Sequence, residues 1–187
     1  MTRATMEIPE ATARRVRLVV LDVDGVLTDG GIYIGVSNGD ECEFKRFDVQ
    51  DGLGVRMMRD AGIHVAIVSG RVSAATDIRA AELGIEDVYQ DAGARKVPVL
   101  EKLLAARSVG WEEVALLGDD LADLPALRRV GLAATVANGV LEVRRVATWQ
   151  SSREGGRGAV REFAEALLRA RGQWDGLVDG YCRKRGG

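Results

Sequence analysis

The chain has few of the residues on which many catalytic and structural sites depend. Its 187 residues include two cysteines, Cys42 and Cys182, and one histidine, His64. Two cysteines so far apart form neither a disulfide framework nor a CxxC pair, so we expect a reducing, cytoplasmic setting. His64 stands alone at the start of an apolar run, which argues against a zinc site and favours a structural role.

The chain also lacks an excess of charge of one sign and any long apolar run. Lys and Arg total 26 against 28 Asp and Glu, a formal net charge of -2. This balance argues against an electrostatic nucleic-acid binder. No apolar run has the length of a signal peptide or a membrane span, so we expect no membrane partner. With 47% hydrophobic residues, a globular enzyme or small-molecule-binding domain is the expected class.

What the chain does contain is an alternation of short apolar runs with helical patterns. Apolar runs occupy residues 18–21, 65–68, 114–117 and 132–136, each with the form of a strand buried on both faces. Helical patterns lie at residues 53–61, 73–83, 96–107, 120–129 and 157–171. The alternation predicts an α/β fold, a parallel sheet flanked by helices. We expect a flexible or loosely docked leader over residues 1–15, a domain over 16–172 and a tail over 173–187.

One segment after the first apolar run departs from this alternation. Residues 32–36 and 42–47 flank Asn38-Gly39, a strong signal for a β-hairpin. The hairpin would be an insertion above the carboxyl ends of the strands, and it would expose Ile32, Ile34 and Phe44. We expect another subunit to cover these side chains. The alternative is a hairpin folded onto its own domain.

Polar residues follow three of the apolar runs. They are Asp22 and Asp24, then Ser69 and Gly70, then Asp119, Asp120 and Asp123. Open parallel sheets bind ligands at the carboxyl ends of their strands, so we expect these three segments to converge on one site.

Carboxylates are the main chemical groups of this predicted site. Asp22 and Asp24 lie two residues apart, so both can face one cleft in extended chain, and their repulsion favours a bound cation or one raised pKa. Asp119 would complete an oxygen-rich set suited to Mg²⁺. Since no histidine or cysteine is a candidate nucleophile, an aspartate is the available one for phosphoryl transfer, with Asp24 as acid and base.

Partners for the phosphoryl oxygens come from the other segments. We predict that Ser69, the Gly70 amide and Lys96 neutralise them. Each piece also has an ordinary interpretation: Ser-Gly is a turn, Lys96 a solvated charge and Asp119-Asp120 a helix cap. Their order along the chain, each after the expected strand, favours the catalytic interpretation.

These residues resemble the motifs of the haloacid dehalogenase superfamily. Residues 22–29 look like its first motif, Ser69 its second, Lys96 its third and residues 118–123 its fourth. The hairpin and the segments 47–52, 83–90 and 155–162 narrow the resemblance to the 3-deoxy-D-manno-octulosonate 8-phosphate phosphatase family, over about residues 17–172. The resemblance implies a capless Rossmann-like domain, Mg²⁺, a homotetramer formed through the 31–47 hairpin, and a role in lipopolysaccharide biosynthesis.

The resemblance also implies residue roles. Asp22 would be the nucleophile and a metal ligand, Asp24 the general acid/base and a ligand through its backbone carbonyl, and Asp119 the third ligand. Ser69, Gly70 and Lys96 would hold the phosphoryl group, and Asp120 and Asp123 would support the metal or Lys96. The candidates for substrate contact are Arg71, Thr28, Asp51 and Arg157.

Several alternatives stay open. The loop 91–95 is longer than the family spacing, so Arg95 competes with Lys96 for the phosphate role. Related phosphatases act on nine-carbon keto-acid 9-phosphates, which leaves the substrate undecided. A phospho-receiver module also uses strand-end aspartates and a lysine, but it has no counterpart of Asp24. A non-catalytic relative would be expected to have lost one of the motif residues.

Overall fold

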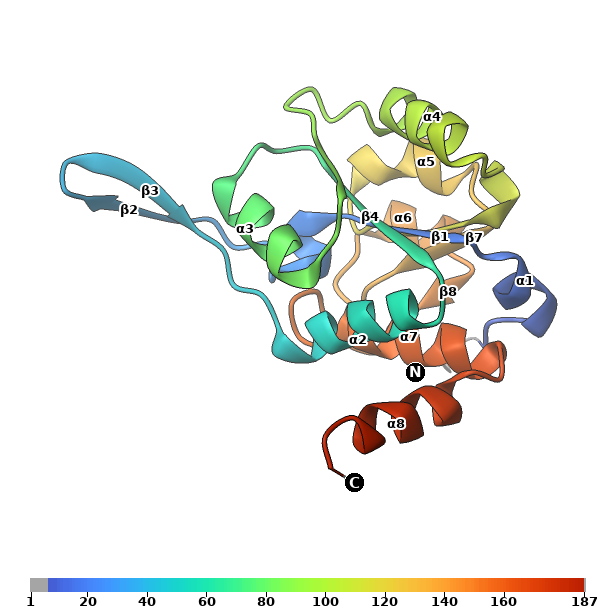
Figure 1. Cartoon of the computed structure of the whole chain (residues 1–187). Helices are drawn as coiled ribbons and strands as arrows, with labels where there is room; N and C mark the ends of the chain where they lie inside the picture. Colours follow the sequence, from blue (N-terminus) through green and yellow to red (C-terminus); the bar gives the residue numbers. More distant parts are fainter. Residues whose placement is uncertain (1–6, 187) are drawn as a thin grey trace.

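A six-stranded parallel sheet forms the centre of the molecule (Figure 1). The computed structural model describes residues 7–186. The strand order is β5-β4-β1-β6-β7-β8, and every neighbouring pair is parallel. The strands are β1 (Leu18–Leu21), β4 (His64–Ser69), β5 (Asp87–Gln90), β6 (Val114–Leu117), β7 (Leu132–Thr135) and β8 (Trp149–Gln150). The predicted α/β fold with a parallel sheet is thereby confirmed.

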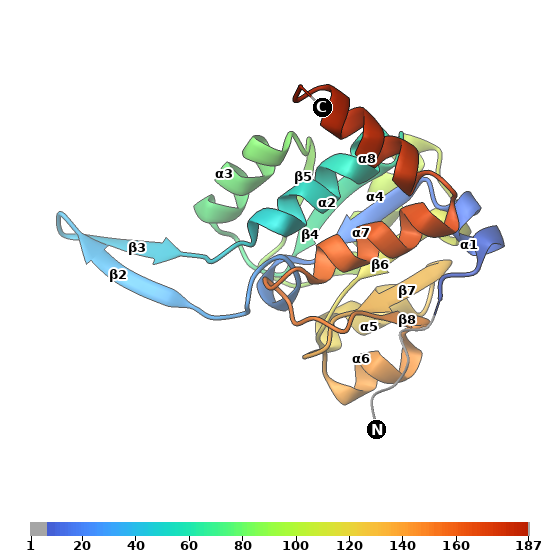
Figure 2. The same cartoon turned by 90° about the horizontal axis from the view of Figure 1, so that it is seen from below.

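Helices cover both faces of the sheet (Figure 2). One face carries α1 (Glu10–Arg15), α2 (Val49–Asp60), α3 (Ala74–Leu83), α7 (Ala159–Ala170) and α8 (Trp174–Arg183). The other carries α4 (Lys96–Arg107), α5 (Leu124–Leu127) and α6 (Leu141–Val146). Side chains alternate along a strand, so Val19 and Leu21 of β1 pack under the first layer and Leu18 and Val20 under the second. A central strand covered on both faces requires the continuous apolar run seen in the sequence.

Part of the amino-terminal segment, expected to be a flexible or loosely docked leader, forms the helix α1. Residues 1–6 lie outside the described part of the chain, but α1 is a helix whose Ala13 is fully buried. Arg171, after α7, donates hydrogen bonds to the carbonyl oxygens of Ala13 (3.0 Å) and Val16 (2.8 Å). These bonds satisfy carbonyl groups that the end of a helix leaves free, and they dock α1 onto α7.

The tail that the sequence left unplaced forms α8. Trp174 is buried in the core, and Leu177, Val178 and Tyr181 pack partly against it. The guanidinium groups of Arg161 and Arg169 lie 5.0 Å and 5.4 Å from the centre of the Trp174 ring. Aromatic burial and these cation–π contacts attach the tail to α7.

The predicted hairpin is present and projects away from the domain (Figure 1). It consists of β2 (Tyr33–Ser37) and β3 (Asp40–Phe44), paired antiparallel. Asn38 and Gly39 both have positive φ values, 54° and 88°, as the tight two-residue turn requires. Ile34 is 66% exposed and Phe44 61% exposed. The alternative of a hairpin folded onto its own domain is not supported.

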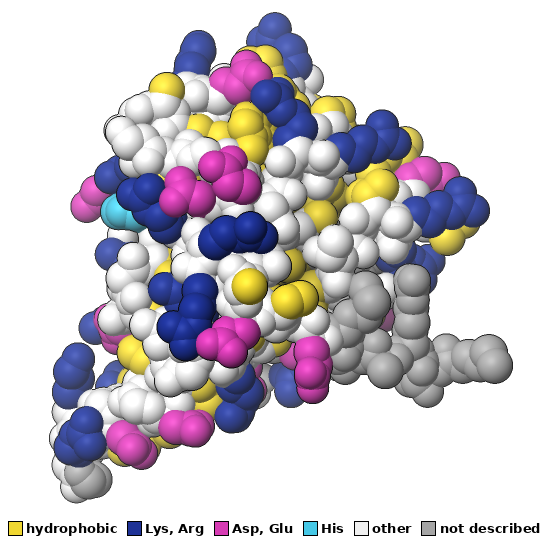
Figure 3. All heavy atoms as spheres, turned by 90° about the vertical axis from the view of Figure 1, so that its right-hand side faces the viewer, with side chains coloured by type: hydrophobic (Ala, Val, Ile, Leu, Met, Phe, Trp, Pro, Cys, Tyr) yellow, Lys and Arg dark blue, Asp and Glu magenta, His cyan; other side chains and the backbone are white. Residues whose placement is uncertain are grey.

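The side of the molecule opposite the hairpin is drawn in Figure 3, where basic and acidic side chains are interspersed with apolar ones. His64 begins β4 and is exposed, at the other end of that strand from Ser69. It therefore lies away from the carboxyl ends of the strands and outside the candidate site. Within residues 7–186, no helix combines the length and the apolar character that crossing a membrane would need.

Candidate active site

The predicted segments converge where the strand order reverses. The chain passes from β1 to β4 and β5 on one side, then returns to β6, on the other side of β1, and continues outward to β7 and β8. Such a switch point opens a crevice at the carboxyl ends of the two inner strands. Asp22 directly follows β1, and its amide donates a hydrogen bond to the carbonyl oxygen of Leu117, the last residue of β6 (3.1 Å). Asp119 follows β6 in the same crevice.

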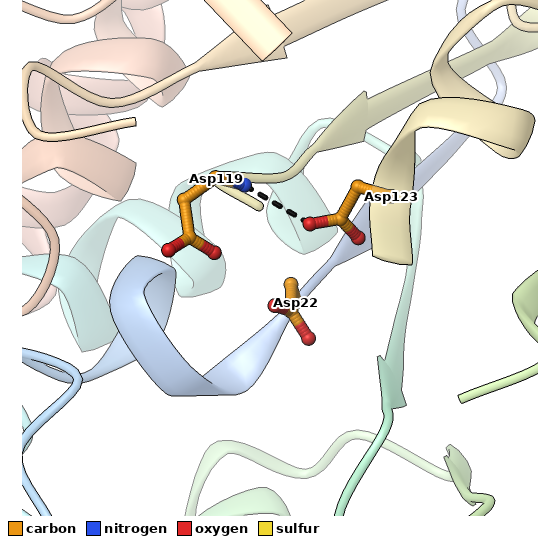
Figure 4. A group of neighbouring side chains, drawn as sticks. All are labelled: Asp22, Asp119 and Asp123. Atoms are coloured by element: carbon orange, nitrogen blue, oxygen red, sulfur yellow. Dashed lines mark hydrogen bonds between the residues drawn. The ribbon is translucent and has the colours of Figure 1, made fainter. Parts of the chain in front are cut away.

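Three aspartates face one another in this crevice (Figure 4): Asp22, Asp119 and Asp123 each place one carboxylate oxygen within 4.8 Å of the others. One oxygen of Asp119, Oδ1, is buried and has no hydrogen-bond partner among the described residues. A buried carboxylate oxygen without a partner is costly unless it binds a cation.

Lys96 provides the positive charge of the cluster. Its Nζ lies 2.7 Å from Oδ1 of Asp22 and 2.5 Å from Oδ1 of Asp123. Its side chain, at the start of α4, is 4% exposed. Arg95, the competing residue, is 75% exposed and pairs instead with Asp91, 3.3 Å away. The geometry therefore favours Lys96 over Arg95 as the residue that binds the phosphoryl group.

Asp123 connects Lys96 to the loop after β6, through an ion pair on one side and backbone hydrogen bonds on the other. Its second oxygen, Oδ2, accepts hydrogen bonds from the backbone amides of Asp119 (3.0 Å) and Asp120 (3.3 Å). Both oxygens are thus occupied, so Asp123 fits a supporting role better than direct metal ligation. Asp120 is exposed and its carboxylate accepts from the Leu121 amide (2.7 Å), which is the ordinary helix-cap arrangement.

The charges in the cluster do not balance. Three carboxylates face one ammonium group, so two negative charges remain. Burial, followed by repulsion from Asp22, raises the pKa of Asp119 to about 8. Burial and the Asp123 charge raise the pKa of Asp22 to about 6. Burial opposes the charged form of Lys96, but the carboxylates of Asp22 and Asp123 outweigh it and raise its pKa. A divalent cation would compensate these charges.

A glycine allows the loop after β1 to approach Asp119. Gly25 has a φ of +94°, and a Cβ at this position would lie 2.1 Å from Oδ2 of Asp119. No other residue type avoids both the strained backbone and the overlap. The loop and the Asp119 carboxylate can therefore be this close only with glycine here.

Ser69 and Gly70 form the turn at the end of β4. The Ser69 hydroxyl donates to the carbonyl oxygen of Arg71 (3.0 Å) and accepts from its amide (3.1 Å). A Cβ on Gly70 would lie 3.0 Å from the Cβ of Ala94, in the loop that leads to Lys96. The turn is thus held beside β1 and against the Lys96 loop, at the edge of the sheet where the aspartates lie.

Comparison with known proteins decides the family. No family model matches the chain. The 3-deoxy-D-manno-octulosonate 8-phosphate phosphatase KdsC of Escherichia coli (strain K12) is 42% identical over 165 residues, which cover 88% of this chain and 86% of that protein. The chain belongs to the 3-deoxy-D-manno-octulosonate 8-phosphate phosphatase family. Membership of this phosphatase family argues against the receiver-module alternative.

Solved structures of this phosphatase family share the fold. A probable YrbI-family phosphatase from Pseudomonas syringae has a TM-score of 0.86 at 44% identity, covering 92% of this chain and 96% of that one. The family member from Moraxella catarrhalis, solved with magnesium ion, phosphate ion and KDO, has a TM-score of 0.85 at 38% identity, covering 92% of this chain and 97% of that one. The aspartate cluster of the present chain is thus one that can bind a metal, in a family with a magnesium-bound member.

In the present chain, two of the residues predicted to contact the substrate are buried. Thr28 is 0% exposed; its hydroxyl donates to the Val23 carbonyl oxygen (3.2 Å) and accepts from the Gly25 amide (3.4 Å). Asp51 is 1% exposed, and its carboxylate accepts from the amides of Gly158 (3.3 Å) and Arg161 (2.8 Å). Burial also raises the pKa of Asp51 to about 6. In this structure the two side chains order loops and the start of α7, and a contact of either one with the substrate stays a prediction.

The two arginines predicted to contact the substrate are accessible. The Arg71 side chain is 40% exposed, and its guanidinium lies 2.7 Å from Glu43. Arg157 is 57% exposed and lies 3.5 Å from Glu154. Both remain candidates for substrate contact.

Sequence reasoning missed a lysine beside Asp24. Lys45, which directly follows β3, pairs through Nζ with Oδ1 of Asp24 and lies 3.5 Å from Oε1 of Glu43. Its side chain is 2% exposed. The available signal was the scarcity of lysine, of which the chain has four.

Proposed function

We propose that this protein is a Mg²⁺-dependent phosphatase that hydrolyses 3-deoxy-D-manno-octulosonate 8-phosphate to the free sugar acid and phosphate. The observation that carries the proposal is the Asp22–Lys96–Asp123 ion-paired cluster, with Asp119 opposite, at the carboxyl ends of β1 and β6. The 42% identity to a phosphatase named for this substrate supports the choice of substrate.

In the first step, a carboxylate oxygen of Asp22 attacks phosphorus, and the bond from phosphorus to the sugar oxygen breaks. Asp24 gives its proton to the departing sugar oxygen, and an aspartyl-phosphate forms on Asp22. Lys96 lies 2.7 Å from the attacking carboxylate. Its ammonium group holds that carboxylate in place and offsets charge on the phosphoryl oxygens.

In the second step, Asp24 takes a proton from water as the water oxygen attacks phosphorus. The bond between phosphorus and the Asp22 oxygen breaks, which releases phosphate and restores the Asp22 carboxylate. Asp24 is then protonated again, ready to act as the acid in the next turnover. The carboxyl group of Asp24 thus takes part in both proton transfers, as the acid in the first step and as the base in the second.

The residues present fit a magnesium ion. Asp22, Asp119 and the backbone carbonyl of Asp24 would hold it, and the partnerless Oδ1 of Asp119 and the raised pKa values of Asp22 and Asp119 support this set. When bound, the ion supplies positive charge that offsets the phosphoryl oxygens and favours ionised Asp22.

We also propose that the chain forms a homotetramer through the 31–47 hairpin. The exposed apolar side chains of the hairpin, among them Ile34 and Phe44, support burial against other copies. The free cysteines Cys42 and Cys182 are compatible with the expected cytoplasmic setting.

The test is phosphate release from octulosonate 8-phosphate in the presence of Mg²⁺. Asp22→Asn keeps the size of the side chain and removes the nucleophile, so we expect its kcat to fall by about 1,000-fold or more with the fold intact by circular dichroism. Asp179→Asn, an exposed change on α8, is the matched control and should retain full activity. Phosphate release by Asp22→Asn at a rate near that of the wild type would refute the nucleophile, and no release by the wild type would refute the function.

A further inference from the structure

Lys45 is a buried lysine outside the four motifs. It lies at the base of the hairpin, and its side chain is 2% exposed. An ammonium group without water requires charged partners. Its partners are Oδ1 of Asp24, with which it is ion-paired, and Oε1 of Glu43 at 3.5 Å.

Glu43 is itself fixed by the loop after β4. Its Oε2 accepts a hydrogen bond from Arg71 (2.7 Å), and its Oε1 accepts one from the hydroxyl of Ser73 (2.7 Å). The Ser73 hydrogen bond, with Lys45 and Arg71 nearby, keeps the pKa of Glu43 below its usual value. Glu43 is therefore an anchored negative charge that gives the ammonium group of Lys45 a second partner besides Asp24.

The two residues after Lys45 also contact loops of the active site. Arg46 donates a hydrogen bond to the carbonyl oxygen of Gly156 (2.6 Å). Phe47 forms an isolated antiparallel bridge with Thr28, four residues after Asp24. The backbone that carries Lys45 is thus attached to the loop that carries Asp24, which keeps the two segments side by side.

The two oxygens of the Asp24 carboxylate differ in their surroundings. Oδ1 is held by Lys45, whereas Oδ2 is buried and has no hydrogen-bond partner within the described residues. With Oδ1 fixed, rotation of the carboxylate is restrained. Oδ2 is then the oxygen left to exchange a proton.

We propose that Lys45 is a positioning residue for Asp24: its ammonium group fixes one carboxylate oxygen so that the other meets the departing sugar oxygen. The inference rests on the proposed acid and base role of Asp24. At 2% exposure, Lys45 has little surface for the substrate itself, so it acts through Asp24. The hairpin thereby contributes to proton transfer as well as to the proposed assembly.

The test compares Lys45→Met with wild type on two substrates with different leaving groups. A sugar phosphate needs a proton on its departing oxygen, whereas p-nitrophenyl phosphate releases a stable anion and needs almost none. The first turnover is compared, because the second step, in which Asp24 is the base, is the same for both substrates. We expect Lys45→Met to slow leaving-group release in the first turnover by about 10- to 100-fold on the sugar phosphate and by less than about threefold on p-nitrophenyl phosphate, with KM little changed. Lys45→Arg, which keeps the positive charge, should recover much of the lost rate.

Matched variants separate positioning from other effects. Lys102→Met, the same change at an exposed site on α4, should leave both rates unchanged. Asp24→Asn should show the same selectivity for the sugar phosphate as Lys45→Met, with a larger loss. The sugar phosphate can be any that the wild type hydrolyses, so an error in the assigned substrate leaves the comparison valid.

Three results would overturn the proposal. The first is an equal loss of rate on both substrates, which would indicate a structural role. The second is no loss of rate on either substrate, and the third is a change confined to KM. If Asp24→Asn slows the first turnover equally on both substrates, the acid role of Asp24 and the positioning role of Lys45 are both wrong. If Lys45→Met does not fold, Glu43→Gln decides by the same criterion, with a smaller selective loss expected because Lys45 remains but is less firmly held.

Discussion

Replacing Asp119 by asparagine should stabilise the metal-free protein while abolishing its response to Mg²⁺. Asp119 faces Asp22 and Asp123, and its Oδ1 is buried without a partner. Its pKa is raised from the usual 3.8 to about 8, mainly by burial. The folded protein therefore binds this proton more tightly than the unfolded chain does, and without metal the Asp119 charge opposes folding.

The expected gain in the free energy of unfolding follows from the removal of one uncompensated buried charge. An unsatisfied buried polar group costs ~1–3 kcal/mol and an unsatisfied buried charge costs more. Exchanging the Asp119 carboxylate for a neutral amide, which is itself unpaired, should therefore raise the free energy of unfolding by about 1–3 kcal/mol at pH 8.5. For a chain of 187 residues, this corresponds to an increase of about 2–12 °C in Tm. The wild type should lose stability as the pH rises from about 4 to about 8, and the variant should lose less.

The assay is thermal unfolding at pH 5 and pH 8.5, with EDTA or with Mg²⁺. Magnesium at 100 times its Kd should stabilise the wild type by ~2.7 kcal/mol and the variant hardly at all. Asp179→Asn, an exposed change on α8, is the control and should follow the wild type throughout. The reasoning is refuted if Asp119→Asn is less stable than the wild type in EDTA at pH 8.5, or if Mg²⁺ stabilises both equally.

Three further predictions concern the loop after β1, the tail and the hairpin. Gly25→Ala should weaken Mg²⁺ activation far more than Gly62→Ala, because both glycines have positive φ but only Gly25 approaches Asp119; equal kinetics for the two variants would contradict this. Trp174→Ala should lower the free energy of unfolding by ~3 kcal/mol in urea titrations, since the ring is buried between α8 and α7, and an unchanged midpoint would show that the tail does not stabilise the domain. Ile34→Asp should reduce the mass measured by light scattering, whereas the same change at the exposed Ile78 of α3 should not; a tetramer that persists in Ile34→Asp would exclude this part of the hairpin as the interface.

Strands with continuous apolar runs were predictable, and those with mixed composition were not. The runs at β1 and β6 match the structure residue for residue because these strands are covered on both faces. The strand β5 lies at the sheet edge and is half-buried along its whole length, so its sequence carries no apolar run. In α8, Trp174, Leu177, Val178 and Tyr181 have helical spacing, but the intervening glycines obscured it.

The convergence of aspartates was also predictable, because parallel strands fix where their ends lie. The partners of individual polar side chains were not. Thr28 and Asp51 lie next to motif residues in the sequence, but their hydrogen bonds go to backbone groups, which only the folded loops bring within reach. Lys45 meets Asp24 across a complete hairpin, and no local pattern encodes that contact.

The most direct test of the proposed function is the ratio of kcat/KM for octulosonate 8-phosphate to that for a nine-carbon keto-acid 9-phosphate and for hexose phosphates, all with Mg²⁺. An enzyme specific for octulosonate 8-phosphate should prefer it by more than about tenfold over each competitor. Equal values, or a preference for the 9-phosphate, would contradict the substrate assignment even though phosphate is released.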